Sequence, residues 1–212
     1  SDCNSLKEGL IDGTIDYLTS MHEPYDIDHK KVVFDDASPG SIGLESMFGL
    51  MCNQFTLEKT IDILRQKRVQ NSIKLLDLGS RQIVDVEPLQ TLTSLEILYL
   101  QENQIQDVSP LATLISLTKL DLGKNQITDV SPLQTLTSLT YLDLNGNQIV
   151  DVSPLATLTS LTELELYNNQ IVDVKPLSTL TSLTVLDLNG NQIVDVSPLQ
   201  TLTSLTYLDL NG

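Results

Sequence analysis

Residues 139–160 read LTYLDLNGNQIVDVSPLATLTS, and this stretch recurs with few changes from residue 73 to the end of the chain. A fixed period of 22 residues indicates stacked coils, each of which buries its apolar side only against its neighbours. The sequence therefore predicts an α/β solenoid over residues 73–212, with six complete units and a seventh that stops after eight residues. The units begin at Ile73, Leu95, Leu117, Leu139, Leu161, Leu183 and Leu205.

The first part of each unit has the pattern of a short strand. Leu142 and Leu144 alternate with Tyr141 and Asp143, and a period of two is typical of a strand with one buried face. We expect the two leucines to lie in the core and Tyr141 and Asp143 to point into solvent. Stacked units should then form a parallel sheet on the concave face of a right-handed, gently curved superhelix.

The second part of each unit returns the chain to the next strand. Asn147 falls where the chain must turn, and a buried side-chain amide can bond backbone groups that no strand serves. Ser153-Pro154 indicates a helix start, with the serine as cap and the proline at the first helical position. Because about one turn fits, we expect a short 3₁₀-like segment on the convex face. The asparagine should form a ladder, since it recurs as Asn103, Asn125, Asn169 and Asn191.

Residues 1–72 have a different composition and hold both cysteines, both histidines and all three methionines. Apolar residues at helical spacing, such as Leu6 with Leu10 and Leu57 with Ile61, predict a mainly helical segment. A solenoid ends in a sheet edge and an open core, so we expect this segment to cap the first coil. A small helical domain with a partner of its own is the alternative.

The last unit leaves Leu205, Leu208 and Leu210 with no following coil in this sequence. This pattern is typical of a fragment of a longer protein. We expect this end either to fray or to pack against another molecule, for example by end-to-end self-association of two copies.

Composition and motifs exclude several functions. The net charge of -16 argues against nucleic acid and anionic membranes as partners, and no apolar run approaches the length of a membrane span. No nucleophile elbow, phosphate loop or metalloprotease motif occurs, so we expect neither an enzyme nor a cofactor. His22, Asp26, Asp28 and His29 lack the spacing of a calcium loop and are interpreted as a solvated loop rather than a metal site. Whether Cys3 and Cys52 pair is left open.

The outward strand positions are the candidate binding site, because they vary from unit to unit while the buried positions hardly change. Neighbouring strands lie about 4.8 Å apart, so one outward column predicts a nearly continuous line of carboxylates. Such a line favours a protein partner with a basic surface, and tyrosines are typical anchors of an interface. The candidates are Tyr99, Lys119, Asp121, Tyr141, Asp143, Glu163, Glu165, Tyr167, Val185, Asp187, Tyr207 and Asp209.

A structural interpretation of these acids is equally open, since they could simply keep an open sheet soluble. A second acidic column follows the turn and is interpreted as structural rather than functional. It consists of Asp85, Asp107, Asp129, Asp151, Asp173 and Asp195.

The pattern L-x-x-L-x-L-x-x-N-x-I resembles the 22-residue leucine-rich repeats of bacterial internalins and of the leucine-rich-repeat regulator of protein phosphatase 1. The phrase at residues 147–155, NQIVDVSPL, is most similar to the internalin-like group. This resemblance implies a non-enzymatic scaffold that binds proteins through its concave face. The alternative is a regulatory or targeting subunit in which the solenoid positions residues 1–72 or a further domain. Internalin-like repeats favour an extracellular or cell-surface location, and a cytoplasmic one is left open.

Overall fold

The computed structural model describes residues 74–211 of the chain. The expected cap or domain over residues 1–72, the pairing of Cys3 with Cys52 and the polar loop at residues 22–29 all lie outside the described residues. The division of the chain at residue 72 therefore stays a prediction.

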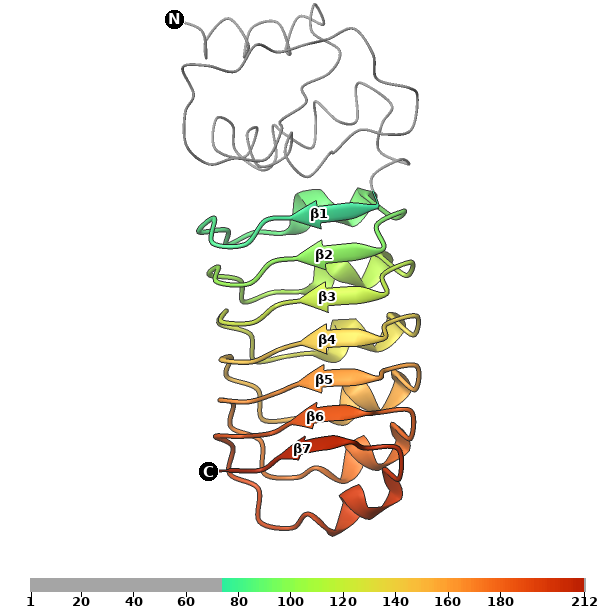
Figure 1. Ribbon diagram of the computed structural model, residues 1–212. Helices are drawn as coiled ribbons and strands as arrows, with labels where there is room; N and C mark the ends of the chain where they lie inside the picture. The colour runs from blue at the N-terminus through green and yellow to red at the C-terminus, as the bar shows by residue number, and fades with distance from the viewer. Residues whose placement is uncertain (1–73, 212) are drawn as a thin grey trace, which may run out of the picture.

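Seven short strands in residues 74–211 form one parallel sheet in the order of the sequence (Figure 1). Consecutive strands pair in register at a spacing of 22 residues, for example Leu120 with Leu142 and Leu142 with Leu164. The coils wind in a right-handed sense, which confirms the predicted superhelix (Figure 1). The strands are β1 (Leu75–Asp77), β2 (Ile97–Tyr99), β3 (Lys119–Asp121), β4 (Tyr141–Asp143), β5 (Glu163–Glu165), β6 (Val185–Asp187) and β7 (Tyr207–Asp209).

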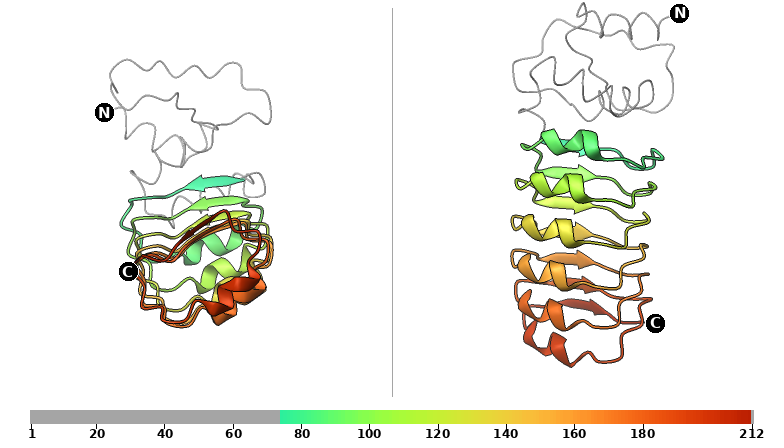
Figure 2. Two further views of the ribbon diagram at one scale, coloured as in Figure 1. Left: turned by 60° about the horizontal axis from the view of Figure 1, so that its bottom comes forward. Right: turned by 180° about the vertical axis from the view of Figure 1, so that it is seen from behind.

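A 3₁₀ segment follows each of the first six strands, and these segments stack on the side opposite the sheet (Figure 2). The predicted short convex turns are therefore confirmed. Each segment has proline at its second position and buries one leucine, such as Leu155. The segments are η3 (Glu87–Thr91), η4 (Ser109–Thr113), η5 (Ser131–Thr135), η6 (Ser153–Thr157), η7 (Lys175–Thr179) and η8 (Ser197–Thr201).

The predicted serine cap of these segments is wrong. Ser153 is the first residue of η6, and its backbone N–H donates to Oδ1 of Asp151 at 2.8 Å. An ionised carboxylate is a stronger acceptor than a hydroxyl, and Asp151 lies two residues upstream, where it can reach the free N–H. The same bond recurs at each segment, which confirms that the second acidic column has a structural role.

The core between the sheet and the 3₁₀ segments is aliphatic. Leu142 and Leu144 are fully buried, as expected from the period of two, and so are Ile149 and Leu158. The core is one continuous cluster that runs from Leu76 to Leu202, and Leu205 of the last coil packs against it. Coils with a neighbour on each side thus bury their leucines, as a solenoid requires, whereas Leu208 and Leu210 of the last coil are 41% and 38% exposed.

The predicted asparagine ladder is present, and it ties adjacent coils together. The side-chain amide of Asn147 donates to the carbonyl oxygens of Leu122, Leu144 and Asn145 at 3.0, 2.9 and 3.1 Å. Its Oδ1 accepts the N–H of Ile127 in the preceding coil at 3.0 Å. These bonds satisfy backbone groups that the strands leave unpaired. The bonds are needed because the site is buried, with Asn147 only 7% exposed.

Two threonine ladders were not foreseen from the sequence. Beside the strands, Oγ1 of Thr140 donates to the carbonyl of Thr118, and that of Thr162 to the carbonyl of Thr140. At the ends of the 3₁₀ segments, Oγ1 of Thr157 donates to the carbonyl of Gln134 in the coil before it. The sequence does contain a pattern that could have predicted both ladders, because threonine recurs at both positions with the period of the repeat.

Candidate functional site

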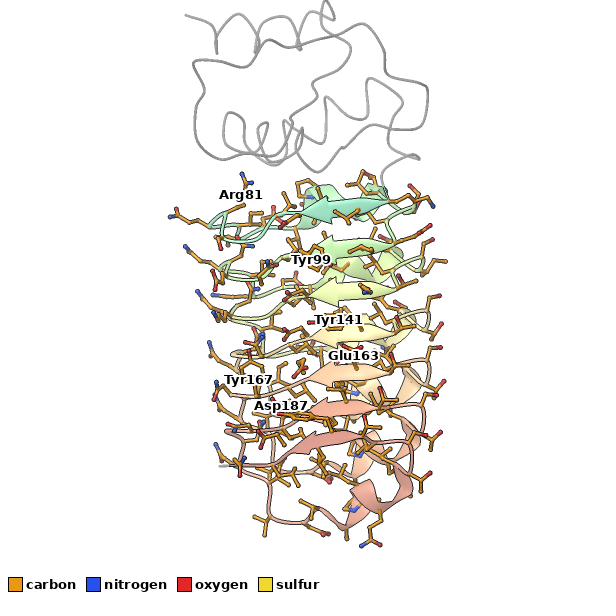
Figure 3. All side chains as sticks on the ribbon, in the orientation of Figure 1. Arg81, Tyr99, Tyr141, Glu163, Tyr167 and Asp187 are labelled. Carbon is orange, nitrogen blue, oxygen red and sulfur yellow. The ribbon has the colours of Figure 1, made fainter. Side chains whose placement is uncertain are left out.

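The concave face is the solvent-facing side of the seven-stranded sheet. It carries two columns of side chains, and each strand contributes one side chain to each column. Figure 3 shows Tyr99, Tyr141, Glu163 and Asp187 along this side, with Tyr167 near the edge where the strands end. The strand register places Glu163 between Tyr141 and Val185, and Glu165 between Asp143 and Asp187. The sequence-predicted candidates therefore do share one face of the fold.

The predicted acidic line is continuous over the last five strands. Asp121, Asp143, Glu165, Asp187 and Asp209 are paired in register on β3 to β7. Tyr99 on β2 interrupts the line, and Asp77 on β1 lies beyond it. Carboxylates on adjacent strands repel by about 1 kcal/mol in water-like surroundings and more where they are partly buried.

The expectation that Asp143 points into solvent is wrong, because it is only 9% exposed although it faces away from the core. Its Oδ1 accepts the backbone N–H and the side-chain amide of Asn145 at 2.8 and 2.7 Å. Asn145 in turn lies over Gly123 of the preceding coil, where a Cβ atom would stand 2.5 Å from its Nδ2. A glycine in one coil thus makes room for the amide that covers the acid of the next coil.

All four aspartates of the acidic line on β3 to β7 have the same local bond. Oδ1 of Asp121 accepts the N–H of Gly123 at 2.9 Å, and Asp187 and Asp209 accept the N–H two residues further on in the same way. This bond stabilises the turns after β3, β4, β6 and β7, so the structural interpretation of the aspartates is supported. Glu165 differs, because its carboxylate accepts no hydrogen bond within the described residues.

The basic side chains on and beside the sheet are unevenly distributed. Nζ of Lys74 contacts Oε1 of Glu96 at 2.7 Å, and Nζ of Lys124 contacts Oε1 of Glu102 at 2.7 Å. Both ion pairs lie in the N-terminal half of the described solenoid. The acids on β5 to β7 have no ion-pair partner among the described residues. The C-terminal half of the concave face is therefore the more negative half.

Burial and mutual repulsion raise the pKa of three acids in the line. Burial raises the pKa of Glu165 to about 7, with further contributions from Asp187, Asp143 and Glu163. Burial also raises the pKa of Asp121 to about 6, against the opposing effect of the bond from Gly123. For Asp143, burial raises the pKa, while the two bonds from Asn145 lower it.

These shifts predict that the solenoid is less stable at about pH 8 than at about pH 5.5. A carboxyl group with a raised pKa in the folded state binds more protons when folded, so stability is lost as pH rises through about 6 to 7. The groups with lowered pKa, such as Asp129, are ionised in both states over this range and contribute no slope. Because both acids remain partly exposed, we expect a difference of about 1 kcal/mol in the free energy of unfolding.

Urea unfolding followed by circular dichroism at both pH values measures this difference. The double variant D121N/E165Q should lose most of it, and comparison with the unaltered chain cancels the contribution of groups elsewhere, including His22 and His29. An identical pH dependence in the two proteins would contradict the assignment.

Residues 74–211 contain no group of three histidine, cysteine, aspartate or glutamate side chains arranged to hold a metal ion. In the same part of the chain, no helix is both long and apolar enough to cross a bilayer.

Stacked 22-residue coils, with a parallel sheet, an asparagine ladder and 3₁₀ turns, define a leucine-rich-repeat solenoid. The family model described as leucine rich repeats (2 copies) matches residues 71–113, 115–157, 159–201 and 181–212. The chain therefore belongs to the leucine-rich-repeat family. Proteins of this family are typically non-enzymatic scaffolds that bind other proteins.

Solved structures place the chain among internalin-like members of the family. An internalin of Listeria monocytogenes (inlF) is 37% identical with a TM-score of 0.68, and the match covers 73% of this chain and 44% of that one. Internalin C2 of the same organism is 35% identical with a TM-score of 0.59, and the match covers 73% of this chain and 84% of that one. A leucine-rich-repeat protein of Leptospira interrogans is 28% identical with a TM-score of 0.61, and the match covers 66% of this chain and 38% of that one.

Curated relatives match over shorter stretches. A dihydroorotase of Listeria welshimeri is 37% identical over 73 residues, and one of Listeria monocytogenes is 38% identical over 72 residues. The chain spans about 17% of the length of these relatives and the matches cover about a third of this chain, so they transfer no activity to it.

Proposed function

We propose that the concave face binds a protein partner, and that a basic surface of that partner lies over the C-terminal half of the sheet. The observation that carries this proposal is the row of acids on β5 to β7, which have no ion-pair partner within residues 74–211. A cationic group laid between two of these carboxylates would remove their mutual repulsion, and the negative field would speed its approach.

Tyrosines beside the acids support an interface at this place. Tyr207 is 50% exposed, and Tyr141 and Tyr167 are half-buried at the edge of the acidic line. A tyrosine ring that is already partly fixed offers large contact area at a low cost in conformational entropy. Acids with aromatic neighbours are also suited to a partner's lysine or arginine, which can contact both.

Charge reversal at Glu165 tests the proposal. Binding of a synthetic peptide of alternating lysine and serine is measured by isothermal calorimetry at low salt, with a glutamate and serine peptide as the negative probe. We expect E165K to weaken binding of the basic peptide at least about tenfold, because a new cation would repel it at the centre of the line.

Glu87 provides the matched control. It is exposed at the start of η3 on the convex side, so E87K changes the net charge equally but should alter affinity by less than about twofold. Equal losses in the two variants would mean that only net charge matters. Capture of a natural partner that survives E165K would favour the alternative function, in which the solenoid positions another part of the chain.

A further inference from the structure

Glu165 occupies an unusual position in the acidic line. On β5 it is paired in register with Asp143 on β4 and with Asp187 on β6, so a carboxyl group lies on each side of it. Glu163 contributes a third negative charge from the same strand. Lys124, whose charge acts on Asp143 and Tyr167, already contacts Glu102.

Glu165 also lacks the hydrogen bond that the carboxylates of Asp143 and Asp187 accept. The N–H of Asn145 donates to Asp143 and that of Asn189 donates to Asp187, whereas the N–H of Tyr167 donates to no carboxylate of the described solenoid. Glutamate is one methylene longer than aspartate, so its carboxylate does not close the tight turn to the amide two residues on. A half-buried carboxylate that lies between two acids and accepts no hydrogen bond is repelled by its neighbours. Protonation of the carboxylate removes this repulsion most easily.

Resting on the proposed function, we propose that Glu165 makes partner binding at the concave face dependent on pH, because a proton and the partner's cationic group compete for its carboxylate. Binding then releases a proton from the Glu165 carboxyl group to solvent. The raised pKa of Glu165 places this competition close to neutral pH. The partner is bound more tightly as the pH rises above about 7 and is released under mildly acidic conditions.

The titration of Glu165 is measured without any partner. Carboxyl carbon chemical shifts of the full chain, with the Glu165 signal assigned through E165Q, should show a midpoint near pH 7. E165D supplies the shorter side chain that can accept the N–H of Tyr167, so its midpoint should fall by about one pH unit or more. E163Q, which removes only a neighbouring exposed charge, should shift the midpoint less. A Glu165 midpoint at the ordinary glutamate value overturns the proposal.

Binding of the lysine and serine peptide is then compared at about pH 8 and about pH 5.5. We expect roughly tenfold weaker binding at the lower pH, a much smaller pH dependence in E165Q, where the raised pKa of Asp121 still contributes, and a pH dependence shifted to lower pH in E165D. If the peptide binds equally at both pH values although Glu165 titrates near 7, the competition is refuted. If the peptide binds at neither pH, the proposed function fails, while the titration still reports whether Glu165 holds its proton.

Discussion

Replacing Asn147 by alanine is expected to lower the free energy of unfolding by about 3–4 kcal/mol. The substitution removes four hydrogen bonds between its side chain and the backbone of two successive coils. The N–H of Ile127 would lose its acceptor at a site that is closed to water, while the carbonyls of Leu122 and Leu144 would each keep one bond, from Asn125 and Asn169. An unpaired buried backbone group costs about 1–3 kcal/mol, so these losses dominate over the small change in packing.

Asn189 provides the control for this experiment. It lies in an N-G-N turn like that of Asn147, but its side chain makes no hydrogen bond in the described part of the chain. N189A should therefore change stability by less than about 0.5 kcal/mol. Chemical unfolding of both variants distinguishes the two positions, and a similar loss in N147A and N189A would show that the ladder bonds contribute little.

The regular parts of the fold could be predicted because each depends on residues within one unit. Leu142 and Leu144 are fully buried as their alternation predicts, and Asn147 has the backbone partners expected of a turn amide. A residue that departs from the pattern in one unit does not obscure the prediction, because the same pattern occurs in the other units. This redundancy explains why the strands, the ladder and the 3₁₀ turns were found from the sequence.

The sequence was misleading where two residues could do the same task. Ser153 before a proline looks like a helix cap, but Asp151 reaches the same N–H and binds it. The burial of Asp143 depends on Gly123 and Asn145, and Gly123 belongs to the preceding coil. Local patterns do not reveal such relations between coils, although an alignment of the units against each other brings these residues into neighbouring positions.

The candidate site follows from the sequence only in outline. The strand register confirms which side chains share the concave face, but the difference between Glu165 and its aspartate neighbours arises from a missing hydrogen bond. In the sequence, Asp and Glu are both acids in one column. In the structure, the extra methylene distinguishes Glu165 from Asp143 and Asp187, whose carboxylates each accept the N–H two residues further on.

The second large effect is expected from a cavity in the middle of the stack. L142A should lower the free energy of unfolding by about 3–4 kcal/mol, because Leu142 is fully buried between the sheet and the 3₁₀ segments. Leu208 occupies the same place in the repeat on β7 but is 41% exposed in this chain, so L208A should cost about 1–2 kcal/mol.

Urea unfolding gives both values, and hydrogen exchange locates the damage. Because each coil contacts only its neighbours, a cavity at Leu142 should lower amide protection mainly in β3 to β5 and leave the distant coils less affected. Loss of the same size in L142A and L208A would mean that the interior is not close-packed at the centre. Protection lost evenly over all strands would instead show that the described solenoid unfolds as one cooperative unit.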